Sequence, residues 1–224
     1  MARRILRFES IDSTQLAAAG QPRGTVLIAD HQTAGQGRHG HSWHSEAGSG
    51  IYCSIVLKPR PLLTLALGVA AVEGIAAATG ITCDLRWPND LMLGGRKIAG
   101  ILVQMVNGDA IAGIGINVNH TSFPSDLEAT SLRIHSNREY DREEIFAALI
   151  TEIDDIVHAE SEDILRLFAR ASSYTAGCRV TVDQPGGAIT GTTAGLDPSG
   201  YLLVRKDDGT VTLIVAGGVR AAGS

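Results

Sequence analysis

The 224-residue sequence has only three cysteines, and they are widely spaced: Cys53, Cys83 and Cys178. This number and spacing match neither a zinc pattern nor a disulfide framework, so we expect buried free thiols in a reducing, cytoplasmic compartment. Long uninterrupted apolar runs are also missing. The longest apolar stretch, residues 62–78, contains Glu73 and two glycines, and the N-terminus lacks the apolar core of a signal peptide. The sequence therefore predicts neither a membrane span nor a secreted protein.

Positive charge is scarce as well. Nineteen lysines and arginines against 24 aspartates and glutamates give a net charge of -5, and the pI is near 5.8. This balance argues against a broad nucleic-acid-binding surface, although it leaves room for a local basic site. Hydrophobic residues make up 44% of the chain and charged residues 19%, which indicates an ordinary globular protein.

The pattern of apolar residues and turns predicts an α/β body followed by a small all-β unit. Strands are expected at 5–8, 25–31, 51–57, 82–86, 91–93, 96–105 and 111–118, and helices at 15–19, 62–79, 141–158 and 161–171, with 120–140 irregular. Four short strands then follow at 178–183, 188–194, 201–206 and 211–215, which indicates a small β-barrel. We therefore place the domain boundary between 1–175 and 176–224.

One stretch, residues 34–43, combines three glycines with Arg38, two histidines and Trp43 directly after a strand. Glycine lets the backbone wrap closely around a ligand, arginine grips phosphate or carboxylate, and tryptophan offers a flat face to a base. The glycines also spell G-x-G-x-x-G, but the dinucleotide-binding motif requires a helix to begin there. Residues 42–50 contain two more glycines and no helical apolar face. We therefore expect a mobile loop that closes over an anionic, partly aromatic ligand.

A second group of candidate residues lies on the expected hairpins. Lys97 alternates with the apolar Ile98, so its side chain should point away from the core, near the turn that carries Asn89 and Asp90. On the strand at 111–118, two glycines and Asn117 alternate with apolar residues and leave one face as nearly bare backbone, which is typical of a place where a ligand approaches closely. A lysine and an arginine around a glycine loop suit a phosphate, and a neighbouring aspartate suits Mg²⁺ or a lysine partner.

Four of the seven histidines fall within a short span: His31, His39, His41 and His44. Their spacing matches no common zinc pattern, and no cysteine or carboxylate is expected to cluster with them, so contacts with phosphate or with solvent are favoured over a metal site. No Ser-His-Asp or Cys-His arrangement is visible, and nothing nominates a covalent nucleophile. The residues alone thus predict an α/β enzyme that binds a nucleotide or another phosphate ligand under a flexible loop, and they leave the second substrate open.

Four motifs together resemble those of biotin protein ligases, in the same order and at suitable spacing. Residues 35–43, G-Q-G-R-H-G-H-S-W, resemble the G-R-G-R-x-G-R-x-W loop of that family, and residues 12–14, D-S-T, match its start. Residues 86–90 and 97–102, R-W-P-N-D and K-I-A-G-I-L, resemble K-W-P-N-D and K-x-x-G-I-L, and residues 113–117 read G-I-G-I-N as the family does. The resemblance covers residues 5–120 closely. It implies a mixed β-sheet flanked by helices, followed by a small SH3-like β-barrel.

The resemblance also implies a two-step reaction with ATP, biotin and Mg²⁺. The biotin carboxylate attacks the α-phosphate of ATP, pyrophosphate leaves, and biotinyl-5′-AMP forms. The ε-amine of a lysine on a biotin carboxyl carrier domain then attacks this mixed anhydride, and AMP leaves. Two anions must meet in the first step, so Arg38, Lys97 and Mg²⁺ would offset their repulsion, and the glycine loop would order over the adenylate and exclude water.

The resemblance implies a role for each residue that matches a family motif. Arg38, Lys97 and Asp90 would be catalytic, with Asp90 orienting Lys97 or holding the metal, for which no other ligand is assigned. The biotin-binding residues would be Ser13, Thr14, Gln15, Gln32, Gln36, Gly37, Arg38, Trp87, Lys97, Gly100, Gly113 and Gly115. The nucleotide-binding residues would be Arg38, His39, Gly40, His41, Trp43, Asn89, Lys97 and Asn117.

The chain departs from the family pattern within the loop. Gln36 stands where the first arginine is expected, His41 follows the third glycine in place of arginine, and Arg86 replaces the lysine before Trp87. Losing two cations should weaken the attraction for phosphate or make it depend on pH through His39 and His41. We therefore expect ligation to persist with a weaker hold on the intermediate.

The same resemblance suggests the partners of the protein and the alternative functions that remain. Many relatives carry an N-terminal helix-turn-helix, but D-S-T begins here at residue 12, and with a net charge of -5 we expect no DNA binding. The expected partner is a biotin carboxyl carrier domain, while an exposed strand edge leaves a homodimer open.

A lipoate-protein ligase of the same general fold is the nearest alternative enzyme. A non-catalytic biotin or adenylate sensor is supported only by Gln36 and His41, and Arg38, Lys97 and Asn117 argue against it.

Overall fold

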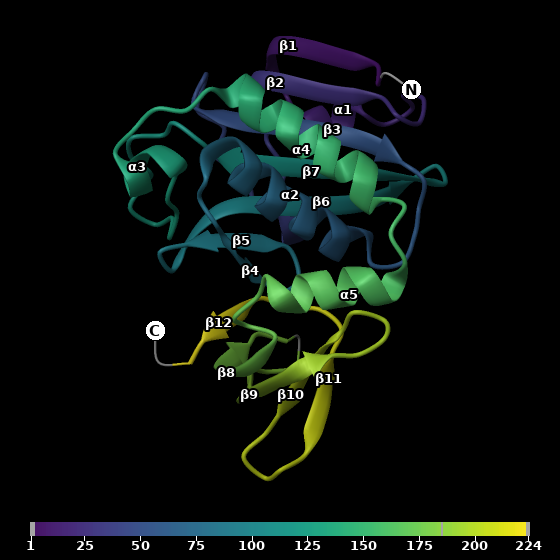
Figure 1. The fold of residues 1–224 in the computed structure, drawn as a ribbon, viewed down its shortest axis with the longest axis vertical. Coiled ribbons are helices and arrows are strands. Elements are labelled where there is room, and N and C mark those ends of the chain that lie inside the picture. Colours follow the sequence, from purple (N-terminus) through teal and green to yellow (C-terminus); the bar gives the residue numbers. More distant parts are fainter. Residues whose placement is uncertain (1–2, 185, 223–224) are drawn as a thin grey trace.

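The computed structural model describes residues 3–184 and 186–222, and its larger part is built on one seven-stranded mixed sheet (Figure 1). In spatial order the strands are β1 (Ile5–Ile11), β2 (Val26–Gln32), β3 (Gly50–Leu57), β7 (Asp109–Asn117), β6 (Arg96–Val106), β5 (Asp90–Leu93) and β4 (Asp84–Arg86). Only β1 and β2 pair in parallel, and the other neighbours are antiparallel. The expected mixed sheet is therefore confirmed.

Helices α2 (Leu63–Thr79) and α4 (Arg142–Ile156) cover one face of this sheet (Figure 1). Helix α2 is apolar nearly all round because it packs between the sheet and α4. Gly74 makes this packing possible, since a Cβ there would lie 2.9 Å from the Cα of Leu149 on α4. Gly80 ends α2 in the left-handed conformation, and Asp141 caps α4 by accepting a hydrogen bond from the backbone N–H of Glu143.

The opposite face of the sheet carries the short helix α1 (Thr14–Ala17) and the glycine-rich loop. Below α1 lies a small apolar cluster of Ala18, Leu27, Val56 and Ile111, separate from the main core. Residues 52 and 54 of β3 and 113 and 115 of β7 are cross-strand partners on this same face. This face of the sheet, beside α1, therefore forms the wall of the candidate site.

The C-terminal part is a five-stranded antiparallel sheet (Figure 1). Its spatial order is β11 (Val211–Ile214), β10 (Leu202–Arg205), β9 (Ile189–Leu196), β8 (Ala176–Val182) and β12 (Val219–Ala221). Helix α5 (Ser161–Arg170) lies between the two sheets. The connection after α5 is tied to β4, because the backbone N–H of Leu85 donates to Ala171 and the Ser172 hydroxyl donates to the Leu85 carbonyl.

The structure adds two elements that the sequence analysis did not predict. Helix α3 (Leu132–Ser136) lies in the stretch expected to be irregular, where Ser131 accepts a hydrogen bond from the backbone N–H of Ile134. Strand β12 pairs with β8, although its three residues are too short for a periodic pattern. Among the residues that the structure describes, no helix has the length and apolar character needed to cross a lipid bilayer.

Candidate active site

The glycine-rich loop folds back on itself as a narrow, hairpin-like turn. The backbone N–H of Gly37 donates to the His41 carbonyl at 2.7 Å, and that of Trp43 donates to the Gly35 carbonyl at 2.8 Å. Its tip is a single 3-10 turn, Arg38–Gly40, in which His39 and Gly40 have φ values of 55° and 78°. No α-helix begins at these glycines in the described chain, so the prediction against a dinucleotide-binding motif is confirmed.

Three glycines on β6 and β7 form the floor beneath this loop: Gly100, Gly113 and Gly115. A Cβ on Gly115 would lie 2.3 Å from Cε2 of Trp43, and one on Gly100 would lie 2.9 Å from Cζ3 of the same ring. A Cβ on Gly113 would lie 2.5 Å from Oε1 of Gln15. The bare strand face predicted from the sequence is therefore present, and it lets Trp43 of the loop lie directly on the sheet.

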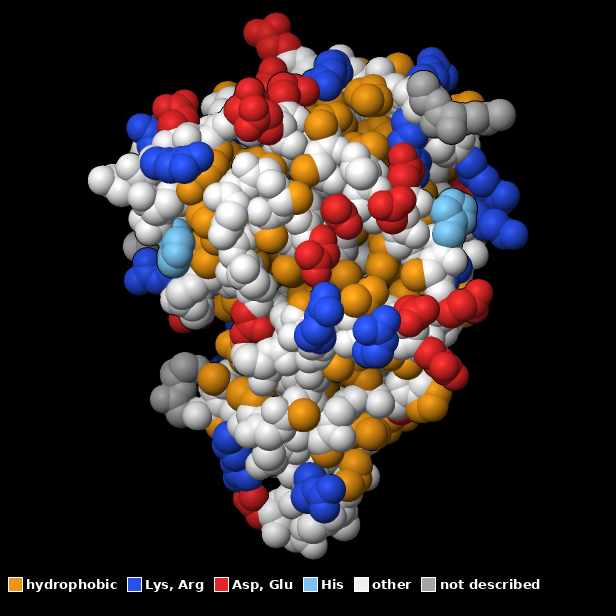
Figure 2. All heavy atoms as spheres, viewed as in Figure 1, with side chains coloured by type: hydrophobic (Ala, Val, Ile, Leu, Met, Phe, Trp, Pro, Cys, Tyr) orange, Lys and Arg blue, Asp and Glu red, His pale blue; other side chains and the backbone are white. Residues whose placement is uncertain are grey.

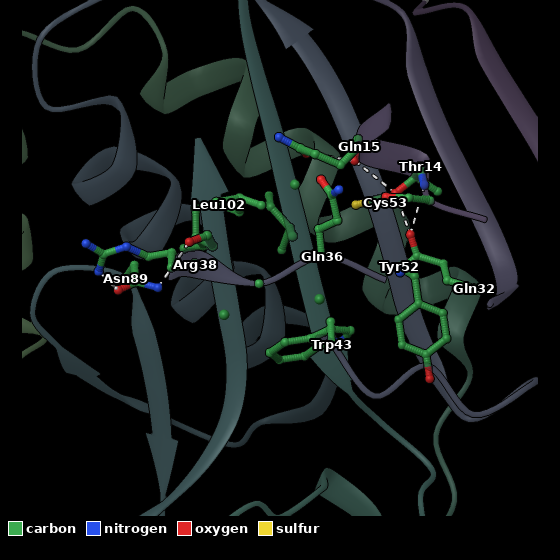
Figure 3. A pocket seen from close by; sticks show the side chains of 18 of the residues that line it. Thr14, Gln15, Gln32, Gln36, Arg38, Trp43, Tyr52, Cys53, Asn89 and Leu102 are labelled. Carbon is green, nitrogen blue, oxygen red and sulfur yellow. Dashed lines mark hydrogen bonds between the residues drawn. The ribbon is translucent and has the colours of Figure 1, made fainter. Parts of the chain in front are cut away.

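A network of polar side chains holds one end of the site in place (Figure 3). The Thr14 hydroxyl and backbone N–H both donate to Oε1 of Gln32, at 3.1 and 2.9 Å, and the hydroxyl lies 2.9 Å from that of Ser54. The Ser54 hydroxyl donates to Oε1 of Gln15, whose Nε2 donates to the Ile111 carbonyl. The rotamers of these buried side chains are thus fixed by one another.

These groups enclose a cavity between α1, the sheet and the loop, which we call the inner cavity (Figure 3). It is lined by Ser13, Thr14, Gln15, Gln32, Gln36, Gly37, Arg38, Trp43, Tyr52, Cys53, Ser54, Asn89, Lys97, Gly100, Ile101, Leu102, Gly113, Ile114 and Gly115. Its wall mixes apolar strand residues with hydroxyls and amides. Such a lining suits a small, largely apolar ligand with a few polar groups.

A second hollow, the outer cavity, lies on the other side of Arg38, Trp43, Asn89 and Lys97, which line both cavities. It is also lined by His39, His41, Asp90, Asn117, Phe123 and Asp126. Loops of the C-terminal part of the chain contribute Asp183, Gly217 and Gly218 to its wall. Two ligands bound side by side would therefore meet at a cationic, partly aromatic junction.

The charges at this junction are arranged in pairs. Lys97 Nζ lies 2.5 Å from Oδ1 of Asp90, and Arg86 Nη2 donates to Oδ2 of the same carboxylate at 2.9 Å. Lys97 Nζ also lies 5.5 Å from the centre of the Trp43 ring. Arg38 donates to Oδ1 of Asn89 at 2.6 Å (Figure 3). Burial lowers the pKa of Arg38, although the negative charge of Asp90 opposes this shift.

Two polar atoms at the inner cavity are buried and have no hydrogen-bond partner: the Ser13 hydroxyl and the Trp43 indole nitrogen. A third, Oδ1 of Asp90, is buried at the junction and contacts Lys97 without hydrogen-bond geometry. Buried polar atoms are rarely left unpaired unless a ligand or water completes them. These atoms mark positions where a bound ligand would form hydrogen bonds. The Cys53 thiol, by contrast, is buried, and burial raises its pKa to about 12, which disfavours the nucleophilic thiolate at neutral pH.

The structure brings nearly all the sequence-predicted residues together. Every expected biotin-binding residue except Trp87 lines the inner cavity, and every expected nucleotide-binding residue except Gly40 lines the inner or outer cavity. Trp87 lines neither cavity, because its ring is buried in the core and its indole N–H donates at 2.9 Å to the carbonyl of Gly200, between β9 and β10; its role in biotin binding stays a prediction. Trp87 therefore joins the two parts of the chain instead of facing the cavity.

Several residues that line the two cavities were not predicted from the sequence. Tyr52 and Ser54 of β3 lie beside the glycines Gly115 and Gly113 of β7 on the same face of the sheet. The alternation along β3 shows that both side chains share one face, but only the strand pairing shows which residues of β7 they adjoin. Asp183, Gly217 and Gly218 reach the outer cavity from loops of the C-terminal part of the chain, for which the sequence carries no local signal.

One expectation about the histidines is wrong. His44 does lie near a carboxylate, because potential metal-binding atoms of His44, Glu46 and His120 all lie within 4.8 Å of one another. His120 lies far along the chain, directly after β7, so the cluster is invisible in the spacing of the loop histidines.

Family models match both parts of the chain. Residues 7–120 match the model of the biotin/lipoate A/B protein ligase family, and residues 175–219 match that of the biotin protein ligase C-terminal domain. The five-stranded C-terminal sheet thus agrees with the SH3-like domain that the sequence analysis expected.

Individual relatives agree with the family models. A bifunctional ligase/repressor from Bacillus spizizenii is 35% identical, with 93% of this chain and 71% of the relative covered. A biotin–[acetyl-CoA-carboxylase] ligase from Mycobacterium tuberculosis is 34% identical, with 87% and 77% covered. Among solved structures, a biotin protein ligase from Aquifex aeolicus in complex with biotin and ATP superimposes with a TM-score of 0.90, at 29% identity over 99% of this chain and 100% of that chain.

Proposed function

The chain belongs to the biotin/lipoate A/B protein ligase family, and from this premise we propose that it is an ATP-dependent biotin protein ligase. It joins biotin and ATP into biotinyl-5′-AMP with release of pyrophosphate. It then transfers the biotinyl group to a lysine amine of a carrier protein with release of AMP. The observation that carries this proposal is the meeting of two cavities at Arg38, Trp43, Asn89 and Lys97.

The inner cavity suits the bicyclic ring and carboxylate chain of biotin. The unpaired Ser13 hydroxyl and the network around Thr14 and Gln15 offer donors and acceptors for a urea-like group, and Leu102 and Ile114 offer apolar surface. The narrow glycine floor supports a compact ring system. The carboxylate would then point toward Arg38 and Lys97, the two cations at the end of the cavity.

The outer cavity suits ATP. Trp43 separates the two cavities and offers a ring for stacking, while Arg38 and Lys97 stand where the carboxylate and the α-phosphate would meet. Their charges would offset the repulsion between two anions and stabilise the charge that develops on the phosphate. No covalent enzyme intermediate is required, because the biotin carboxylate is itself the nucleophile.

The wall of the outer cavity also fits Mg²⁺. Asp90 and Asp126 line it, and Mg²⁺ prefers carboxylate oxygens together with substrate phosphates; Oδ1 of Asp90 lies 2.5 Å from Lys97 Nζ and would be shared with that lysine. Mg²⁺ bound with ATP would supply charge neutralisation of the phosphates. We propose Asp90 as the residue that orients Lys97 and contributes to this site.

For the second step we propose a biotin carboxyl carrier domain as the partner, because its lysine amine must reach the junction from solvent. We propose that the enzyme does not bind DNA, since the net charge is -5 and acidic and basic side chains are interspersed on the face shown in Figure 2. A gel shift with biotin and ATP tests this.

Free thiols at Cys53, Cys83 and Cys178 support a cytoplasmic location. The free edge of β1 would allow a homodimer, which light scattering of the purified protein tests.

The test is biotin-dependent exchange of pyrophosphate into ATP, run beside lipoate. Exchange with biotin but not with lipoate is the expected outcome. Exchange with lipoate would assign the chain to the lipoate branch of the family. Binding of biotin without any exchange would assign it as a sensor, and transfer to a purified carrier domain then tests the second step.

A further inference from the structure

We propose that His44, Glu46 and His120 form a binding site for Zn²⁺ at the margin of the outer cavity. The potential ligand atoms of the three side chains lie within 4.8 Å of one another. Two histidines and a carboxylate are a common zinc ligand set, with a fourth position left for water. This ligand set does not include Asp90 or Asp126, although Asp126 lines the same hollow as His44 and Glu46.

The hydrogen bonds around His120 determine which of its ring nitrogens is free. The Tyr52 hydroxyl donates its only proton to the Glu46 carbonyl at 2.9 Å, and it also lies 3.1 Å from Nε2 of His120. Nε2 must therefore carry the proton and donate to the Tyr52 oxygen. The lone pair is left on Nδ1, which is buried and has no partner.

This arrangement is the one that a metal-binding histidine needs. Such histidines usually donate their second N–H to an oxygen, which fixes the tautomer and the ring orientation. His120 is fully buried and is stacked on Phe123, with ring centres 4.9 Å apart and planes inclined by 21°.

The other two ligands come from the end of the glycine-rich loop. Ser45 between them accepts a hydrogen bond from Nε2 of Gln32, while its neighbours approach His120. The rings of His44 and His120 have centres 5.8 Å apart. Among the described residues, neither the His44 ring nor the Glu46 carboxylate takes part in a hydrogen bond or ion pair.

The cluster is open to solvent on the side of His44 and Glu46, whereas His120 is buried. His44 and Glu46 line a hollow that also contains Ser10 and Asp126, which provides an entry path. Zinc bonds of about 2.1 Å separate tetrahedral ligands by roughly 3.4 Å, so small rotations of the accessible Glu46 and His44 side chains would complete the site.

A bound zinc ion would join two walls of the outer cavity. His44 follows Trp43 on the loop, whereas His120 begins the segment whose later residues pair with the backbone of Lys97, since Lys97 N–H donates to Glu128 and Thr130 N–H donates to Lys97. Zinc would therefore hold the loop against the segment that supports Lys97.

The test is zinc binding by the full chain after removal of metals with a chelator. Competition with a chromophoric chelator should give one site per chain, and Co²⁺ in its place should show the visible absorption of a low-symmetry site. H44A and E46Q should each weaken zinc binding at least tenfold, as should H120N. The matched control H158A removes an exposed histidine after α4 and should leave the affinity unchanged.

Two outcomes would overturn the proposal. One is the absence of a stoichiometric site. The other is an unchanged affinity in both H44A and E46Q, with loss in H41A, which would put the zinc at the loop tip. H44A and E46Q alter accessible side chains, so they keep the test decisive if H120N does not fold. Because the readout is metal binding, it does not depend on whether the chain ligates biotin.

Discussion

Asp90 holds Lys97 at the junction of the two cavities, with Oδ1 2.5 Å from Nζ, while its other oxygen accepts a hydrogen bond from Arg86. The carboxylate thus fixes the direction of one cation and shares its charge with a second. Lys97 is also placed over the Trp43 ring, so the ammonium is oriented before any substrate enters. A preorganised charge of this kind contributes most when it faces charge that develops in the transition state.

Removing this charge should slow adenylation. We expect Lys97→Met to lower kcat for biotin-dependent pyrophosphate exchange by about 10²–10³-fold, the range found when one preorganised electrostatic contact is lost. Asp90→Asn should cost less, because the lysine remains. Lys58→Met, at an exposed lysine, is the matched control. Equal rates in the Lys97 and Lys58 variants would contradict this role.

The glycine floor should not tolerate a side chain. Gly115→Ala places a methyl group against the Trp43 indole and should raise the KM for both biotin and ATP by about tenfold, since inserting atoms into a packed site costs about 1–3 kcal/mol. Gly186→Ala, where a Cβ meets nothing within 4 Å, should leave both constants unchanged. The two KM values measured for each variant check this prediction.

Restoring the arginine of the family loop should improve retention of the intermediate. Gln36 lines the inner cavity, and a charged donor there would strengthen a hydrogen bond to the adenylate by roughly 1.5 kcal/mol. Gln36→Arg should therefore release biotinyl-5′-AMP about tenfold more slowly in a single-turnover assay. No decrease in the release rate would count against this explanation of the loop.

Trp87 should matter for stability and not for substrate binding. Trp87→Phe removes the N–H that donates to Gly200 and should lower the free energy of unfolding by about 1–2 kcal/mol in urea. The KM for biotin should stay the same. A raised KM with unchanged stability would instead support the sequence-based prediction that Trp87 binds biotin.

Cys53 should resist alkylation although it lines the inner cavity. Its raised pKa, about 12, leaves it almost wholly as the thiol at pH 8, so we expect iodoacetamide to react roughly a thousandfold more slowly than with a free cysteine. Cys178, which is less buried, should react first, and all three cysteines should react in guanidinium. Mass spectrometry of tryptic peptides measures each site, and rapid labelling of native Cys53 would contradict its burial.

The sequence predicted most of this site because its information is local. Alternation along β7 identifies the glycine floor, and the glycine turns at 94–95 and 107–108 fix the hairpins that carry Lys97 and Asn117. Residues within one motif are held close by the chain itself. Two cations, Arg38 and Lys97, near glycine-rich segments therefore indicated a phosphate-binding site before any contact was known.

The remaining features depend on packing between distant segments. The Trp87 indole N–H donates to the Gly200 carbonyl in the C-terminal part of the chain, a contact that no pattern near Trp87 reveals. The approach of His120 to Glu46 likewise follows from the pairing of β3 with β7 and from the Tyr52 hydroxyl between them. Contacts between distant segments produce no periodic pattern in the sequence, so they can be identified only in the folded structure.

The glycine floor also limits how this protein could change its substrate. At Gly100, Gly113 and Gly115 there is no side chain left to shorten, so mutation at these positions can narrow the inner cavity but cannot widen it. Room for a bulkier acid would have to come from the facing residues Gln15, Tyr52 or Trp43. Redesign toward larger biotin analogues should therefore begin on the loop, on α1 and at Tyr52 of β3, and leave the three glycines untouched.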